Sequence, residues 1–288
     1  MNLTRGTLFV VATPIGNLED LSPRARNVLA AVDIVAAEDT RHTGRLLSTF
    51  GIKARQTSLH EHNEEDVAQT LISEMERGSS VALVSDAGTP LVSDPGYRLV
   101  RAAHEHGIAV SPVPGPSAAL AALSASGLAT DAFCFEGFLS ARAQARRGRL
   151  EALRSEPRTM IFYESVHRVK GAVADFVAAF GDRRRAFIGR ELSKLHEQCV
   201  AAPLGELQAM LDDGRIPLKG EFVIAVEGDA GTPAGSGSAL DADRLLSELI
   251  PLMPGKKAVE VTAAVTGENR NALYRRMLEL SSARGTKP

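Results

Sequence analysis

Short apolar runs alternate with helix-like segments through the first 117 residues of the chain. Four runs have the length and β-branched content of buried parallel strands: 8–12, 32–37, 81–84 and 108–110. Three segments between them carry helical spacing or helix-boundary signals: 21–31, 41–50 and 64–77. Ser22 followed by Pro23 marks the start of the first helix. The alternation predicts a parallel sheet with right-handed crossovers, in an α/β domain over residues 1–116.

The pattern changes after Ser117. A segment of small residues, 118–127, predicts one helix. Strand-like runs follow at 133–139, 159–163, 185–189 and 221–226. These elements predict a second α/β domain over residues 117–227.

A glycine-rich segment separates this domain from a helical C-terminus. Its composition predicts a flexible linker over residues 228–240. Three helices are expected beyond it, at 245–252, 256–265 and 270–280, with a turn at 266–269. A small helix–turn–helix-like domain over residues 241–288 is typical of nucleic-acid recognition, and Arg270, Arg275 and Arg276 lie on its last helix. Packing and dimerisation remain open as alternative roles.

Three of the apolar runs end in turns rich in glycine and proline, at 13–18, 85–96 and 111–117. In an open parallel sheet, ligands bind beyond the carboxyl ends of the strands, so these turns are placed to wrap one small molecule. Gly88 and Gly96 let the backbone approach a ligand closely, and Asp86 and Asp94 supply hydrogen-bond acceptors. The alternative is three ordinary strand-exit turns.

Composition narrows the class of protein. The 288 residues, 44% of them hydrophobic, suffice for two cores, and the net charge of −2 means that any RNA site is a local patch. Cys134 and Cys199 allow no disulfide framework, and His60 and His62 lack a third ligand at metal-binding spacing. No metal is therefore expected. The sequence also lacks signal-peptide, membrane-span, dinucleotide, Walker and serine-hydrolase motifs, which favours a soluble, cytoplasmic protein.

Several motifs occur together and in order: Thr13–Leu18, Ala37–Arg41, Ser85–Pro90, Pro114–Ala118, Phe162–Arg168, Gly189–Lys194 and Lys219–Phe222. With them the chain resembles the tetrapyrrole-methylase-like class of S-adenosylmethionine-dependent methyltransferases. Within that class it is most similar to the ribosomal RNA small subunit methyltransferase I family. The resemblance implies 2′-O-methylation of a cytidine in the decoding region of 16S rRNA, a cofactor cleft between the two α/β domains, and a homodimer. It further implies that the substrate is an assembled or nearly assembled small ribosomal subunit.

The resemblance and the turns together indicate the residues that hold S-adenosyl-L-methionine. We expect cofactor contacts from Asp86, Ala87, Gly88, Asp94, Ser117, Ala118, Tyr163, Gly220 and Glu221, with Pro14, Ile15 and Gly16 as the floor of the site. Structural roles are the alternatives: Pro14 could simply shape a turn, and Tyr163 could be a core aromatic.

Methyl transfer from a sulfonium is an in-line displacement, so the enzyme must align donor and acceptor and help the ribose hydroxyl lose its proton. Glu38, Asp39 and His42 are candidate bases because they follow a strand at the same sheet edge. Arg41 beside them is a candidate for phosphate contact. The plain alternative is a helix N-terminus, where acidic residues are favourable.

Clusters of basic residues predict where RNA binds. Residues 142–149 carry four arginines and no acid, and further cations lie in the family motifs. The predicted RNA contacts are Arg41, Arg142, Arg146, Arg147, Arg149, Arg168, Arg190 and Lys194. Binding through such groups weakens steeply with salt. A solvated helix face is the alternative.

Two other functions fit parts of the sequence. One is C-methylation of a tetrapyrrole or precorrin, for which neither the arginine clusters nor the helical tail is needed. The other is a non-catalytic RNA-binding protein of ribosome assembly that keeps the same fold.

Overall fold

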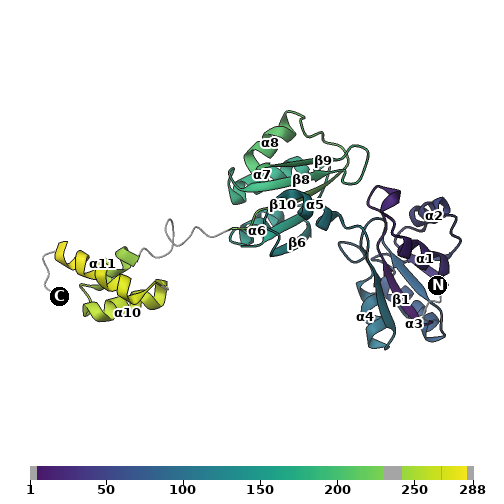
Figure 1. Cartoon of the computed structure of the whole chain (residues 1–288), viewed down its shortest axis with the longest axis horizontal. Coiled ribbons are helices and arrows are strands. Elements are labelled where there is room, and N and C mark those ends of the chain that lie inside the picture. Colours follow the sequence, from purple (N-terminus) through teal and green to yellow (C-terminus); the bar gives the residue numbers. More distant parts are fainter. Residues whose placement is uncertain (1–4, 230–241, 267, 284–288) are drawn as a thin grey trace. The chain divides into compact units, whose positions relative to one another are not determined.

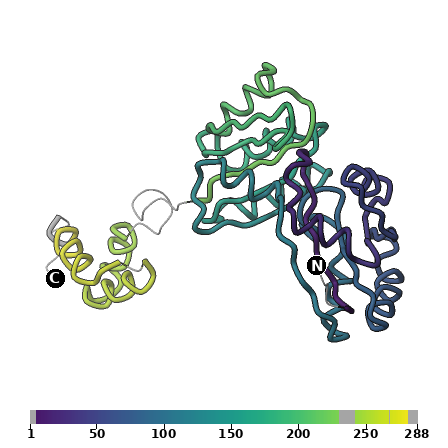
Figure 2. Tube along the Cα trace, turned by 45° about the vertical axis from the view of Figure 1, so that its right-hand side comes forward, coloured from purple at the N-terminus to yellow at the C-terminus, as the bar shows by residue number. Residues whose placement is uncertain are grey.

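The computed structural model describes residues 5–229, 242–266 and 268–283. The chain divides into two compact units at Gly228. The first unit contains two five-stranded sheets, each built from one continuous stretch of chain (Figures 1 and 2). The second unit is helical. No helix in the described ranges is long and apolar enough to cross a membrane.

The first sheet is entirely parallel, as predicted, in the strand order β3-β2-β4-β1-β5. Its strands are β1 (Thr7–Val11), β2 (Ile34–Ala37), β3 (Arg55–Ser58), β4 (Val81–Val84) and β5 (Ala109–Val113). Its helical elements are η1 (Leu18–Asp20), α1 (Pro23–Ala31), α2 (Thr40–Thr49), α3 (Glu64–Glu76) and α4 (Tyr97–Glu105). The Ser22 hydroxyl caps α1 by accepting from the Ala25 amide, with Pro23 in the first turn.

Alternate residues of each strand fill two separate cores, one on each face of this sheet. Val35 packs in a cluster with Val28 of α1, whereas its neighbour Ile34 packs in a cluster with Leu71 of α3 and Leu99 of α4. Both faces are therefore covered, which explains why the strands are continuous apolar runs.

The edge strands of this sheet depart from the sequence prediction. The turn expected at 111–117 begins later, because β5 continues through Pro112 to Val113. Proline is tolerated there because β5 is an edge strand that pairs only with β1. The opposite edge, β3, was not predicted, since its polar sequence Arg55–Ser58 carries no apolar alternation.

The second sheet is mixed, with strand order β6-β7-β10-β8-β9 and a single parallel pairing, between β6 and β7. Its strands are β6 (Phe133–Phe138), β7 (Thr159–Ser165), β8 (Arg185–Arg190), β9 (Gln198–Pro203) and β10 (Glu221–Val226). Its helices are α5 (Ala118–Ser126), α6 (Ala143–Ala152), α7 (Val169–Phe180) and α8 (Leu204–Asp212). The last three pack in one core, around Phe162 and Phe176. Helix α5 packs in a second core of this sheet, and Ile15 also contributes to that core. The first sheet with its helices forms the first lobe of the unit, and the second sheet with its helices forms the second lobe.

The C-terminal unit consists of α9 (Ala242–Leu249), α10 (Gly255–Thr266) and α11 (Arg270–Ala283) around Leu246, Val259 and Leu273. Its helical character agrees with the prediction. Apart from its first two positions, the predicted linker lies outside the described residues. Gly228 itself is buried, and a Cβ there would lie 2.1 Å from the Pro157 carbonyl oxygen, so it still packs against the second lobe.

Candidate active site

A cavity of about 370 Å³ is lined by loops from both lobes of the α/β unit. The first lobe contributes residues that follow β1, β2 and β4, and the second contributes the start of α5 and the ends of β6 and β7. The residues that line the cavity include Ile15, Glu38, Asp86, Gly88, Asp94, Ser117, Ala118, Phe138, Tyr163 and Glu221. The cavity therefore lies at the carboxyl edge of the parallel sheet, where the sequence predicted a ligand.

Hydrogen bonds join the three strand-exit loops to one another. The Thr13 amide donates to the Gly88 carbonyl (2.8 Å), and the Gly88 amide donates back to the Thr13 carbonyl (3.0 Å). The Thr89 hydroxyl donates to the Pro116 carbonyl across 3.0 Å. The predicted convergence of these loops is thus confirmed by geometry.

Glycine is required at the centre of this junction. Gly88 has a φ of +84°, which favours glycine, and a Cβ there would lie 3.3 Å from the Ile15 side chain. The neighbouring segment carries strain as well, because Leu91 and Ser93 have φ values of 71° and 67°. Strain of this kind is concentrated at binding sites, and Ser93 lines the cavity.

Three carboxylates in the cavity form no ion pair with a described residue: Glu38, Asp86 and Asp94. The Arg41 guanidinium interacts with Asp86 only at longer range. Burial raises the pKa of Asp94 to about 6, and the negative charges of Glu38 and Asp86 add to the rise. Burial also raises the pKa of Glu38, again assisted by Asp86. The described lining contains no lysine, arginine or histidine, so the cavity favours a positively charged ligand.

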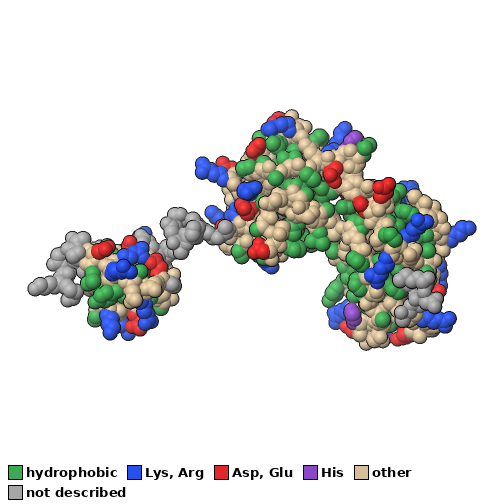
Figure 3. Space-filling model, viewed as in Figure 1, with side chains coloured by type: hydrophobic (Ala, Val, Ile, Leu, Met, Phe, Trp, Pro, Cys, Tyr) green, Lys and Arg blue, Asp and Glu red, His purple; other side chains and the backbone are tan. Residues whose placement is uncertain are grey.

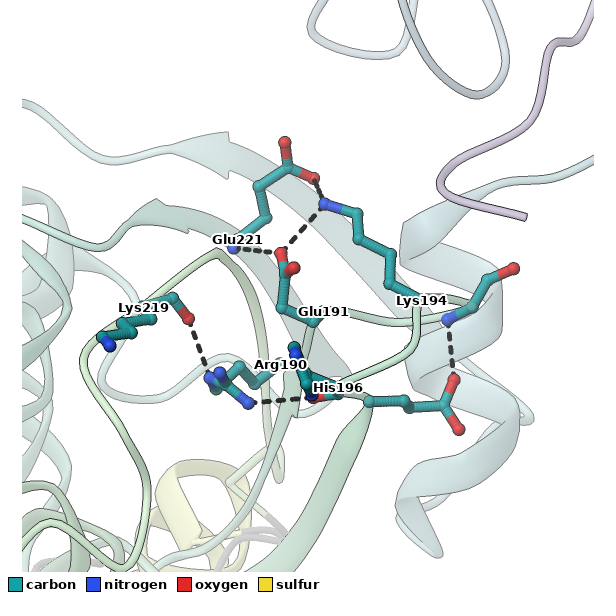
Figure 4. Close-up of polar contacts among 8 residues, drawn as sticks. Arg190, Glu191, Lys194, His196, Lys219 and Glu221 are labelled. Carbon is teal, nitrogen blue, oxygen red and sulfur yellow. Dashed lines mark hydrogen bonds and ion pairs between the residues drawn. The ribbon is translucent and has the colours of Figure 1, made fainter. Parts of the chain in front are cut away.

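Two further carboxylates at the cavity are neutralised by the protein. Arg168 pairs with Glu164 at 2.9 Å. Lys194 Nζ lies 2.9 Å from Glu191 Oε1 and 3.0 Å from Glu221 Oε2, and the Glu221 amide donates to the same Glu191 oxygen (Figure 4). The stem of this lysine occupies the space beside Gly16, where a Cβ would lie 2.3 Å from Lys194 Cγ.

Most of the predicted cofactor residues line the cavity: Ile15, Asp86, Ala87, Gly88, Asp94, Ser117, Ala118, Tyr163 and Glu221. Pro14, Gly16 and Gly220 lie outside its lining. Gly220 has a φ of +84°, and a Cβ there would lie 2.2 Å from the Glu191 carboxyl carbon, so its role in this structure is close packing. Tyr163 accepts a hydrogen bond from the Ala119 amide at 3.2 Å, at the start of α5.

The three candidate bases, Glu38, Asp39 and His42, differ in their position relative to the cavity. Glu38 lines the cavity, whereas Asp39 and His42 do not. The Asp39 carboxylate caps α2 by accepting from the Arg41 amide, and it pairs with the Arg41 guanidinium at 2.7 Å. These hydrogen bonds hold the pKa of Asp39 well below its usual range. Asp39 is therefore an acidic residue at a helix N-terminus, which is the structural alternative to a catalytic base.

Several predicted RNA contacts have structural partners. Arg146 is 8% exposed and pairs with Asp175 at 2.6 Å, and Arg190 is equally buried and donates to the Lys219 and His196 carbonyls (Figure 4). RNA contact through either guanidinium stays a prediction that this burial does not favour. Arg149 pairs with Glu136 at 2.5 Å but remains half exposed.

Exposed cations remain around the α/β unit. The side chains of Arg41 and Arg147 are 86% and 70% exposed, and Arg142 is exposed at the start of α6. Acidic and basic side chains are interspersed on the face shown in Figure 3, rather than separated into a large basic region. Any RNA surface on this face is therefore local.

Sequence reasoning missed Phe138 and Leu192, which also line the cavity. The only signal for Phe138 was an aromatic directly after a glycine at the end of a predicted strand. Leu192 lies in the Gly189–Lys194 motif but carries no chemistry of its own.

Comparison with known proteins adds an independent observation. Residues 7–208 match the family model "Tetrapyrrole (Corrin/Porphyrin) Methylases", and residues 236–281 match the "RsmI C-terminal HTH domain". The chain is 50% identical to ribosomal RNA small subunit methyltransferase I of Escherichia coli O157:H7, over 96% of both chains. It is 49% identical to the protein of that name from Pseudomonas aeruginosa, over 96% of this chain and 98% of the relative.

A solved structure shares the fold of the α/β unit. Uroporphyrin-III C-methyl transferase from Thermus thermophilus, complexed with S-adenyl homocysteine, aligns with a TM-score of 0.53 at 19% identity. The alignment covers 77% of this chain and 97% of that one.

Proposed function

Because the chain belongs to the ribosomal RNA small subunit methyltransferase I family of tetrapyrrole-methylase-like enzymes, we propose that it transfers the methyl group of S-adenosyl-L-methionine to a ribose 2′-hydroxyl. The acceptor is a cytidine in the decoding region of 16S rRNA. The observation that carries the proposal is the cavity between the two lobes, whose unpaired carboxylates suit the sulfonium and ammonium charges of this cofactor.

The residues present fit the cofactor. Asp86 and Asp94 offer carboxylate oxygens to its ammonium and hydroxyl groups, and Gly88 lets the backbone approach it. We retain the predicted cofactor residues that line the cavity as the cofactor site: Ile15, Asp86, Ala87, Gly88, Asp94, Ser117, Ala118, Tyr163 and Glu221. When bound, the cofactor supplies an electrophilic methyl group, and the protein holds the acceptor in line with it and excludes water.

Glu38 is the proposed acceptor of the ribose proton. It is the one candidate of the three that lines the cavity, and its raised pKa makes it a better base near neutral pH than an ordinary carboxylate. We expect Glu38→Gln to lower the single-turnover methylation rate by about 10²–10⁴-fold. His42→Ala is the matched control, because His42 follows the same strand but lies outside the lining.

The partner is the RNA of the small ribosomal subunit. Arg41, Arg142, Arg147 and the half-exposed Arg149 supply phosphate contacts, and the helix–turn–helix unit supplies a further surface. The family also suggests a homodimer in the cytoplasm. No cluster of three metal-ligating side chains occurs in the described ranges, and the proposed reaction assigns no role to a metal.

Two alternatives are less well supported. Tetrapyrrole C-methylation is suggested by structures that share only the fold, at 21% identity or less. The rRNA methyltransferase relatives match at about 50% over nearly the whole chain, and the helix–turn–helix model matches as well. A non-catalytic assembly protein would have no need of the unpaired carboxylates in the cavity.

Methylation of small subunits from a strain that lacks its own copy of this enzyme tests the proposal. Mass-spectrometric mapping after incubation with the chain and S-adenosyl-L-methionine should show one new 2′-O-methylcytidine in the decoding region. A methyl group on carbon, or no new methyl group on RNA, would contradict it.

A further inference from the structure

An aromatic side chain at the edge of the cavity has no role in the core. Phe138 is the last residue of β6, lines the cavity, and is 55% exposed. Its position beside the cavity leaves one face of the ring accessible to a ligand.

A bulge in β6 determines where this ring points. The pairing of β6 with β7 shifts register between Phe135 and Gly137, and Gly137 has a φ of +65°. In a regular strand, Phe135 and Phe138 would face opposite sides of the sheet. Here both rings contact Tyr163 edge-on, with centroid distances of 4.9 and 5.5 Å. The bulge therefore turns Phe138 toward the cavity.

The backbone next to this ring lies close to the first lobe. A Cβ at Gly137 would lie 3.1 Å from Ser93 Oγ, so the tip of β6 abuts the strained segment that carries Asp94. Tyr163 fixes one edge of Phe138 while more than half of the side chain stays exposed. Such a ring offers a preorganised aromatic face.

We propose that Phe138 stacks on the base of the target cytidine and so guides its ribose into the cavity, an inference that rests on the proposed function. A nucleotide within a folded RNA must leave its stack before its ribose can reach an enclosed donor. Aromatic faces receive such bases. Arg142 directly precedes α6, four residues after Phe138, and its exposed side chain can meet the flanking phosphates.

The cofactor adenine is the competing occupant of this face. The carboxylates without an ion pair, which suit the charged groups of the cofactor, all belong to the first lobe, whereas Phe138 lies at the end of β6 in the second lobe. The substrate base is the group that arrives from outside. Binding measurements with cofactor alone and with subunits separate the two occupants.

The test compares four variants: Phe138→Ala, Phe138→Leu, Phe138→Tyr and Phe133→Ala. Phe133→Ala is the matched control, since Phe133 is exposed at the other end of the same strand and does not line the cavity. Loss of stacking in Phe138→Ala and Phe138→Leu should raise KM for small subunits roughly 10- to 100-fold. Phe138→Tyr and the control should keep the parent KM, and calorimetry should give the parent Kd for S-adenosyl-L-methionine throughout.

An unchanged KM in Phe138→Leu would overturn the inference, as would a Kd for S-adenosyl-L-methionine that weakens in step with KM. If Phe138→Ala does not fold, the comparison of Phe138→Leu with Phe138→Tyr decides alone. Failure of the proposed function is distinguished because it appears in the parent chain, as absence of 2′-O-methylcytidine.

Discussion

Two aspartates of the α/β unit, one buried and one partly buried, differ in whether a cation of the protein neutralises them. Asp175 on α7 is 5% exposed and lies between Arg146 and Arg147, at 2.6 and 2.8 Å. Burial raises its pKa, but the hydrogen bonds from the two arginines outweigh burial and lower it overall. Asp94 in the cavity has no such partner among the described residues, and its pKa rises to about 6.

The difference separates structural carboxylates from binding ones. The chain supplies its own cations where a carboxylate joins α6 to α7, and it supplies none as an ion-pair partner of Asp94 among the described residues. A carboxylate without a counter-charge weakens the fold, so its retention is best explained by a cationic ligand.

The largest expected effect concerns the paired aspartate. Asp175→Ala leaves the Arg146 charge buried without a partner, which should lower the free energy of unfolding by about 3–5 kcal/mol. Urea denaturation at neutral pH measures it. The double variant Arg146→Leu, Asp175→Leu should recover most of the loss, because it removes both charges. Equal destabilisation in the single and double variants would contradict the claim that the loss comes from the unpaired Arg146 charge.

A smaller loss is expected at Glu164, which lines the cavity but pairs with Arg168. Glu164→Gln weakens a charge-assisted hydrogen bond and should cost about 1–2 kcal/mol in unfolding free energy. Affinity for S-adenosyl-L-methionine should hardly change. A large loss of affinity with full stability would place Glu164 among the binding carboxylates instead.

The smallest expected effect on stability is a gain rather than a loss. The pKa of Asp94 is raised above its ordinary value of 3.8 to about 6, so its contribution to stability is full below about pH 4 and is lost as pH rises through 6. Asparagine cannot ionise, so Asp94→Asn should raise Tm at about pH 8 by about 2–4 °C. The gain should vanish near pH 4. A lower Tm at pH 8 would show that the charged form of Asp94 stabilises the empty protein.

Much of the fold could be predicted from local pattern. The buried strand 81–84 and the Ser22–Pro23 helix start need only neighbouring residues to be recognised. The polar edge strand β3 escaped because it has no apolar alternation. Loop convergence followed from the parallel arrangement of the strands, which the alternation of elements implies.

The features that could not be predicted involve partners that are distant in sequence. In the sequence, Arg146 resembles an ordinary surface charge. Its buried hydrogen bond to Asp175, 29 positions away, is visible only in the structure. Gly16 packs against the side chain of Lys194, which belongs to the second lobe. The orientation of Phe138 depends on a β-bulge that is visible only in the strand pairing. Local sequence contains none of this information.

Calorimetric titration of S-adenosyl-L-methionine into the parent chain and Asp94→Asn, at about pH 7.5 and about pH 5, tests most directly whether the unpaired carboxylates hold the cofactor. The parent should lose affinity by up to about tenfold, because about nine in ten Asp94 carboxyl groups become protonated at about pH 5. Asp94→Asn should bind weakly at both values while remaining folded. Equal affinity of the two proteins at both pH values would contradict the account.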